Sequence, residues 1–242
     1  MIRGVFIAAF NTAIIALALG CGTEEKSSDA GVGDYFPLAV GDTWLYEEDD
    51  GVAVTRVQYE VIDFATKTFG NGIGDKEVFF VKNTFPNGGG DTDSPDGWRM
   101  QYYLDDGTRI DRLRHEVYDV GDILTKTRDY DPGFLRFDRG KTVGDQWAED
   151  FTRYTDSTPE ITTDEIVTDE TSYLFEVVGY QTVNVTAGEF NCVVWKRTET
   201  DTSGEIKLYY YAPDVGKVKE VTGDKVEQLV SCTVGGVTYG GV

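Results

Sequence analysis

Residues 173–200 read YLFEVVGYQTVNVTAGEFNCVVWKRTET, and this stretch decides the fold class. Tyr173, Phe175 and Val177 are apolar at alternate positions, which is the period of a half-buried β-strand. An Ala-Gly pair then supplies a turn into a second strand over residues 190–200. The stretch therefore predicts an antiparallel hairpin.

The same pattern continues toward the end of the chain. A Ser-Gly turn leads into a predicted strand over residues 206–212, and a Gly-Asp turn separates residues 217–222 from residues 226–234. Short connections of this kind join neighbouring antiparallel strands. The last third is therefore predicted to be an up-and-down meander.

The first half of the chain carries similar signals. Every second side chain is apolar in residues 56–61, and residues 75–85 are rich in Val and Phe. Residues 98–104 and 108–118 flank an Asp-Asp-Gly hairpin signal, in which Gly supplies a positive φ. These segments extend the prediction of antiparallel strands to most of the chain.

The predicted organisation is one all-β domain over residues 35–242. No dozen residues in it show the sustained apolar stripe of a helix. Residues 87–97 are rich in Gly and Asp and residues 155–170 in Thr and acidic side chains, so we expect two mobile loops there.

A short motif occurs twice, about a hundred residues apart. Residues 40–44 read VGDTW and residues 143–147 read VGDQW. Each copy places a Trp at the start of a strand after a Gly-Asp turn. The repeat predicts two related halves that meet near residue 140.

Four motifs together resemble the TapB-like group of bacterial lipoproteins. They are FPL at 36–38 before VGDTW, TVNVTAGEF at 182–190, YYYAPDVG at 209–216 and VKEV at 218–221. In that group the second motif usually contains Val-Pro-Ala-Gly-Thr-Phe, whereas this chain has Thr186 and Glu189 in place of the Pro and the Thr. The resemblance implies a curved antiparallel sheet, as a half-barrel or open barrel, and no catalytic residues.

Residues 1–20 are typical of an export signal. Arg3 precedes a short apolar run that ends in Leu-Ala-Leu-Gly before Cys21. This ending resembles a lipobox, although Ala18 stands where Leu is usual. We therefore predict cleavage before Cys21 and lipid on its thiol. The alternative is an ordinary secretory signal that ends by chance at a cysteine.

Residues 21–34 are predicted to be a flexible tether, because their single large apolar side chain, Val32, cannot form a core. Several acyl chains on Cys21 would give stable anchoring. Gly22 is not the Asp that favours retention at the inner membrane of enterobacteria, so the predicted location is the outer membrane. The expected membrane contact is through the lipid alone.

The chain is strongly acidic, with 43 Asp and Glu against 22 Lys and Arg and a net charge of −21. Nucleic-acid binding requires a cationic face that releases counterions, so this class of partner is excluded. The charge is typical of a soluble surface, and binding of a cationic partner remains an alternative.

If Cys21 carries lipid, Cys192 and Cys232 remain as a pair. An exported chain meets an oxidising compartment, so we predict a disulfide between them, worth about 4 kcal/mol. The alternative is two buried thiols. Residues 91–97 (DTDSPDG) resemble a calcium loop in part, but Pro and Gly are misplaced for an EF-hand, so a plain acidic turn is preferred. The alternative is a calcium site of another type, because several hard oxygens converge there.

His115 is the one histidine in the chain. A serine or cysteine triad needs a histidine beside a nucleophile and an acid, and no Gly-x-Ser-x-Gly turn is present. We therefore predict a surface or strand-edge histidine, no catalytic residue, no metal site and no cofactor.

The resulting functional prediction is a non-enzymatic cell-envelope lipoprotein. Its concave sheet would bind an apolar ligand or a protein partner, an inference that rests on fold analogy. Two alternatives remain: a structural or assembly lipoprotein that acts through its outer surface, and a carboxylate-dependent hydrolase.

Overall fold

The computed structural model describes residues 33–87, 97–157, 166–200 and 203–241, and these residues form an all-β fold. The strands are β1 (Thr43–Asp49), β2 (Val54–Phe69), β3 (Gly74–Thr84), β4 (Trp98–Asp105), β5 (Arg109–Tyr118), β6 (Leu124–Asp138), β7 (Gln146–Asp156), β8 (Val167–Val185), β9 (Gly188–Glu199), β10 (Ile206–Ala212), β11 (Gly216–Thr222), β12 (Lys225–Val234) and β13 (Val237–Tyr239).

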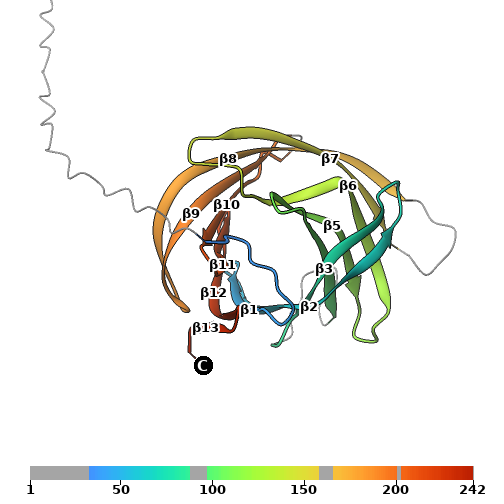
Figure 1. The fold of residues 1–242 in the computed structure, drawn as a ribbon. Coiled ribbons are helices and arrows are strands. Elements are labelled where there is room, and N and C mark those ends of the chain that lie inside the picture. The colour runs from blue at the N-terminus through green and yellow to red at the C-terminus, as the bar shows by residue number, and fades with distance from the viewer. Residues whose placement is uncertain (1–32, 88–96, 158–165, 201–202, 242) are drawn as a thin grey trace, which may run out of the picture.

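Each strand pairs antiparallel with the next along the chain, and β12 returns to pair with β1. In that closing ladder Trp44 lies opposite Cys232 and Asp49 lies opposite Val226. The first twelve strands therefore form a closed barrel (Figure 1). The all-β antiparallel prediction is confirmed, but the sheet is closed rather than a half-barrel or open barrel.

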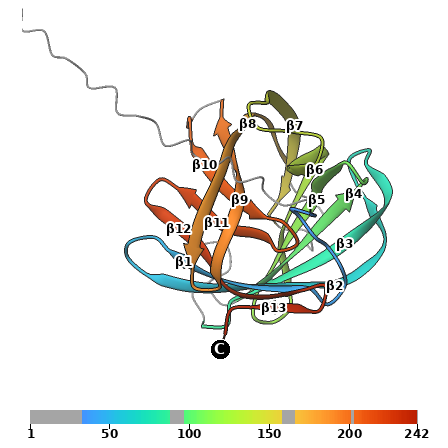
Figure 2. The ribbon, with the colours of Figure 1, turned by 60° about the vertical axis from the view of Figure 1, so that its left-hand side comes forward.

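The short strand β13 pairs with the last part of β12. β1 pairs with one edge of β12, and β13 occupies the part of the other edge that β11 does not reach, because β11 pairs only with Lys225–Gln228. Figure 2 shows β13 at the base of the barrel beside the C-terminal end of the described chain. The barrel therefore needs no strand from beyond residues 43–239, so this part of the chain can fold around its own core.

The barrel encloses one large apolar cluster. It joins Trp44 of β1, Tyr103 of β4, Phe137 of β6, Trp195 of β9 and Tyr211 of β10. Side chains from strands around the whole ring can meet only inside it, so this cluster fills the interior. A smaller cluster around Phe69, Val78 and Tyr102 lies apart from it; adjacent residues such as Tyr102 and Tyr103 point to opposite faces of the wall.

The segment 33–42 enters one end of the barrel before β1 begins (Figure 1). The Phe36 ring lies 5.8 Å from that of Tyr103 and 6.0 Å from that of Tyr211, measured between centroids. Asp34 forms an ion pair with Arg139, at 3.3 Å. This entry segment, as we call residues 33–42, therefore packs against the interior instead of continuing the predicted tether.

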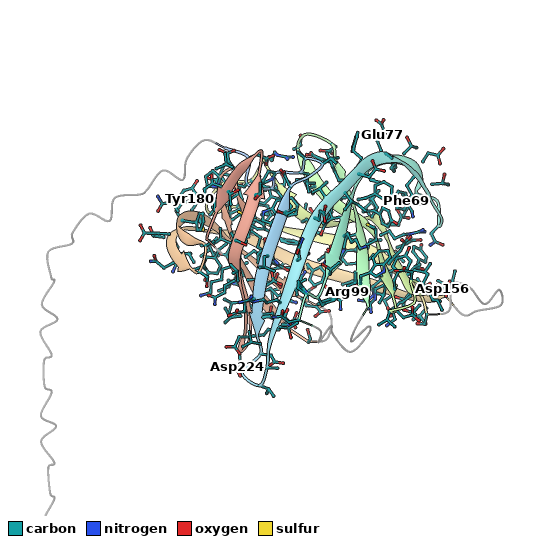
Figure 3. All side chains as sticks on the ribbon, turned by 90° about the horizontal axis from the view of Figure 1, so that it is seen from below. Phe69, Glu77, Arg99, Asp156, Tyr180 and Asp224 are labelled. Atoms are coloured by element: carbon teal, nitrogen blue, oxygen red, sulfur yellow. The ribbon has the colours of Figure 1, made fainter. Side chains whose placement is uncertain are left out.

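The two ends of the barrel differ. Figure 3 shows Tyr180 and Glu77 toward one end and Arg99, Asp156 and Asp224 toward the other. The entry segment lies at the first end, where its Asp34 backbone nitrogen donates to Asp214.

No helix in the described residues is long and apolar enough to span a membrane.

The repeated Gly-Asp motif forms two turns with the same hydrogen bonds. Gly41 N donates to Val61 O at 2.8 Å, and Gly144 N donates to Val177 O at 2.8 Å. The two glycines have φ values of 97° and 94°. A register shift follows the paired valine in both cases, in β2 and in β8. The derivation of the two halves from one ancestor stays a prediction.

Candidate binding site in the barrel interior

An aromatic cavity lies between the entry segment and the barrel wall. Its volume is about 60 Å³, which is room for a few non-hydrogen atoms, and it is partly open. The lining is mostly apolar and includes Phe36, Leu38, Trp44, Tyr46, Tyr59, Val81 and Tyr103. Two cations, Arg136 and Lys217, complete the wall.

Hydrogen bonds hold the aromatic wall in place. The Trp44 indole Nε1–H donates to Val215 O at 2.6 Å, and the Tyr46 hydroxyl donates to Lys217 O at 2.7 Å. Gly216 lies between these two acceptors with φ +93°, and a Cβ there would stand 3.5 Å from Trp44 Nε1. Glycine is therefore suited both to the backbone conformation and to the close approach of the indole.

Arg136 is the cation of the cavity that has no acidic partner. Its side chain is half-buried, and its guanidinium lies over the Phe134 ring at 5.4 Å and the Tyr209 ring at 5.8 Å. Its Nε is buried without a hydrogen-bond acceptor, and no ion pair to Arg136 occurs among the described residues. Burial disfavours the charged form, but Tyr103, Tyr209 and Tyr211 outweigh it and raise the Arg136 pKa.

Lys217, the other cation, is neutralised by two carboxylates, the buried Glu227 and the half-buried Glu220. It forms ion pairs with Glu220, at 2.9 Å, and with Glu227. Burial opposes ionisation of Glu220, yet Lys217 and Lys207 lower its pKa to about 2. Burial raises the Glu227 pKa against the attraction of Lys217.

Opposite pKa shifts in neighbouring carboxylates are the pattern of an acid–base pair. Glu220 and Glu227 lie opposite each other on β11 and β12. However, both already bind Lys217, and the cavity beside them has a volume of only about 50 Å³. The arrangement is that of an internal charge network and leaves little room for a substrate.

A second, wider concavity of about 500 Å³ lies on the inner faces of β5 to β8. It contains Arg112, Arg128 and Arg153 with His115 and Asp169. Arg153 is paired with Asp169 at 2.9 Å, and Arg112 Nη2 donates to the Tyr130 hydroxyl at 3.0 Å. Basic side chains are thus gathered inside a chain whose overall charge is strongly negative.

The prediction of a surface or strand-edge position for His115 is wrong. His115 is 7% exposed and lies on β5 opposite Gln101 of β4 and Arg128 of β6. Strand β5 is paired along both of its edges, and the side chain of His115 faces the barrel interior, as does that of Gln101.

The predicted disulfide is not formed in this structure. Cys192 on β9 and Cys232 on β12 are both free, buried thiols, which was the stated alternative. Burial raises the pKa of Cys192 to about 12 and that of Cys232 to about 11. Both thiols are therefore protonated at neutral pH, and it is the thiolate that carries out disulfide exchange.

Some predicted features lie outside the described residues. These are Cys21 with the leader, most of the tether and residues 91–96 of the calcium-like loop. The predicted loop over residues 155–170 is shorter than expected, because β7 extends to Asp156 and β8 begins at Val167. Within the described ranges, no three His, Cys, Asp or Glu side chains are grouped to hold a metal ion.

Comparisons with known proteins identify similar structures but no family. No protein-family model matches the chain, and no curated protein matches it in sequence. A crystallised protein from Bacteroides fragilis, assigned as exported and as having a YmcC-like fold, is 16% identical with a TM-score of 0.46, and the match covers 83% of this chain and 99% of that one.

A second crystallised protein, from Parabacteroides distasonis, is assigned as a lipoprotein. It is 14% identical with a TM-score of 0.40, and the match covers 83% of this chain and 98% of that one. Both values describe distant likeness. The barrel assignment rests on the strand pairing itself, and the resemblance to TapB-like lipoproteins stays a prediction.

Proposed function

We propose that this chain is a non-enzymatic lipoprotein of the bacterial cell envelope that binds a small apolar molecule inside its barrel. Lipid on Cys21 would hold it on the outer membrane. The observation that carries the binding proposal is the aromatic cavity beneath the entry segment. Ligand sites are typically concave, mostly apolar and supplied with a few polar groups, as this cavity is.

The position of the cavity fits a tethered binding protein. Phe36 and Leu38 of the entry segment form part of its wall. The same segment follows directly on the predicted tether, residues 21–34, so the cavity lies at the end of the barrel from which the tether leaves. A ligand would therefore enter near the membrane-proximal side of the domain.

The alternative of an outer-surface assembly protein has less support. Such a role calls for a contiguous exposed apolar patch. The exposed large apolar side chains of the described residues are spread over several strands and turns, for example Val54 on β2, Val120 in a turn and Leu174 on β8. Isolated exposures of this kind are normal for a soluble domain.

A hydrolase is likewise less supported than a binding protein. The carboxylates best placed for acid–base work, Glu220 and Glu227, share the ammonium group of Lys217.

A protein partner remains compatible with the cavity if it inserts a single apolar side chain.

The binding proposal can be tested with hexan-1-ol and purified residues 33–242 by isothermal titration calorimetry. We expect saturable binding by the wild type and at least tenfold weaker binding after Leu38→Trp, which fills the cavity. Leu174→Trp, on the outer wall, is the matched control and should bind as the wild type does. If the wild type saturably binds neither hexan-1-ol nor a six-carbon probe with another head group, the proposal is ruled out.

The anchor has an independent test. Mass spectrometry of the mature protein from its native membrane should find an acylated Cys21 at the N-terminus. A free amine on any later residue would contradict the anchor and leave the cavity proposal standing.

A further inference from the structure

We infer that the ligand of the cavity carries a carboxylate, which Arg136 binds inside the barrel. The inference rests on the proposed binding function and names its ligand class: a small apolar monocarboxylate, or the acid end of a longer one. Its basis is the juxtaposition of a half-buried, unpaired guanidinium with an aromatic cavity.

A cation that is removed from water without an anionic partner is energetically unfavourable. Removing an ion from water is strongly unfavourable, and buried charges are therefore usually paired. Arg136 is half-buried with its Nε enclosed, and the rings of Phe134 and Tyr209 lie against its guanidinium, while Glu220 influences its pKa without forming an ion pair with it. The rings offset part of the cost, since a cation is attracted to an aromatic face.

The acids that could have paired with Arg136 are already occupied. Glu220 is the carboxylate that influences it, and Glu220 is held by Lys217 at 2.9 Å and approached by Lys207 at 3.8 Å. Glu227 is likewise held by Lys217. Arg136 adds to the charge that stabilises ionised Glu220, but it forms no ion pair with either carboxylate among the described residues, so its guanidinium N–H groups are not used by this network.

Three phenols of the site already have hydrogen-bond acceptors. The Tyr103 hydroxyl donates to Gln101 Oε1, and the Tyr211 hydroxyl donates to the backbone oxygen of Arg136 at 3.2 Å. The Tyr46 hydroxyl is used by Lys217 O. An anionic group that entered the cavity would meet a donor with spare hydrogen-bonding capacity at Arg136.

A carboxylate suits this donor better than other groups. The planar guanidinium matches it with two parallel N–H···O bonds, and such charge-assisted bonds are about twice as strong as neutral ones. The cavity holds only a few atoms, so the acid group and a short apolar stretch would fill it. The remainder of a longer ligand would lie in the open mouth beside Phe36 and Leu38.

The test compares probes of equal chain length on residues 33–242 by calorimetry: hexanoate, hexan-1-ol and hexylammonium. We expect hexanoate to bind the wild type at least tenfold more tightly than hexan-1-ol, and hexylammonium to bind least. Dodecanoate, measured below its micelle concentration, separates the two sources: tighter binding than hexanoate indicates a long-chain acid, and weaker binding indicates a short one.

Two substitutions assign the effect to Arg136. Arg136→Met should weaken hexanoate binding at least tenfold and leave hexan-1-ol within twofold of the wild type, whereas Arg136→Lys should keep part of the preference for the acid. Arg153→Met is the matched control, because Arg153 lies in the wider concavity and is paired with Asp169. It should behave as the wild type.

The outcomes separate this inference from the proposal beneath it. If hexan-1-ol binds the wild type as tightly as hexanoate, the carboxylate inference is wrong and the binding function stands. If neither probe binds, the binding function itself fails. Because the comparison of probes on the wild type decides the matter alone, it holds even if Arg136→Met does not fold.

Discussion

The turns at Gly41-Asp42 and Gly144-Asp145 have the same hydrogen bonds, but the tryptophans that follow them lie in different environments. In both, the Asp carboxylate accepts a backbone N–H from three residues earlier, Ala39 or Thr142. In both, a Trp follows two residues after the Asp. Trp44 is 7% exposed and donates to Val215 O, whereas the half-buried Trp147 has its indole N–H enclosed without an acceptor in the described chain.

The difference shows which part of the cavity region is determined by the local sequence and which part depends on segments that are distant in the chain. The turn needs only glycine at a positive φ and an Asp that accepts nearby backbone donors, so it recurs wherever the motif does. The cavity needs the entry segment and Gly216, which lie beside Trp44 and line the cavity with it. Trp147 instead stacks with Phe175 at 5.5 Å and contacts Trp195 edge-on. A shared motif thus gives one binding wall and one packed core.

Between the regions around Trp44 and Trp147, the largest difference in the effect of a substitution on stability is expected for the lysines. Lys217 shares the cavity with Trp44, and Lys141 lies over the Trp147 ring at 4.8 Å. Lys217→Met leaves the buried Glu227 and the half-buried Glu220 without their shared cation, so it should lower the free energy of unfolding by about 3–5 kcal/mol. Lys141→Met loses one cation–π contact, about 0.5–1 kcal/mol. Urea unfolding of residues 33–242 measures both.

The same network predicts a pH dependence of the wild type. The Glu220 pKa is lowered from 4.5 to about 2 in the folded state, so ionised Glu220 stabilises the fold. This contribution is present above about pH 4.5 and is lost as the pH falls toward 2. The gap in unfolding free energy between the wild type and Glu220→Gln should therefore shrink over that range. A constant gap would contradict the assigned ion pair.

The next largest difference in unfolding free energy is expected for the two turn aspartates. Asp42 is 5% exposed, and its second carboxylate oxygen accepts Gly235 N at 2.9 Å, a contact that reaches across to the turn after β12. Among the described residues, the Asp145 carboxylate bonds only within its own turn, to Thr142. Asp42→Ala should cost about 3 kcal/mol of unfolding free energy and Asp145→Ala about 1 kcal/mol. Equal losses would show that the Gly235 contact contributes nothing.

Much of the fold could be predicted because it follows from local period and turn chemistry. The predicted strand over residues 206–212 coincides with β10, and alternation places Tyr209 and Tyr211 together, with ring centroids 6.1 Å apart. The strand β6 was not predicted. It contains Pro132, and its inward positions include Arg128 and Arg136, so its apolar alternation is broken.

The candidate site could not be predicted in the same way. Nothing near Arg136 in the sequence distinguishes a half-buried guanidinium from an exposed one, because its surroundings come from β4, β10 and β11. Closure of the barrel likewise depends on the pairing of β1 with β12, nearly two hundred residues apart. The sequence signal that does point to the site is the FPL segment at 36–38, which lies against the barrel interior.

The indole groups offer a finer separation of the two regions. Trp44→Phe removes the donor to Val215 O and leaves that buried carbonyl without its partner, so we expect a loss of about 1–2 kcal/mol. Trp147→Phe removes an enclosed N–H that has no acceptor in the described residues, and this gain should offset the smaller ring. Its unfolding free energy should change by less than about 0.5 kcal/mol. A loss at Trp147 equal to that at Trp44 would contradict the contrast.

The glycines are the pair for which no difference is expected. Gly41 and Gly144 have φ near +95°, and nothing lies within 4 Å of a Cβ added to either. Alanine at each position is therefore opposed by backbone strain alone, about 1–2 kcal/mol. Equal losses for Gly41→Ala and Gly144→Ala would place the whole difference between the regions in the side chains beyond the turn. A clearly larger loss at Gly41 would show instead that the entry segment tightens its own turn, and the two turns would then no longer be equivalent.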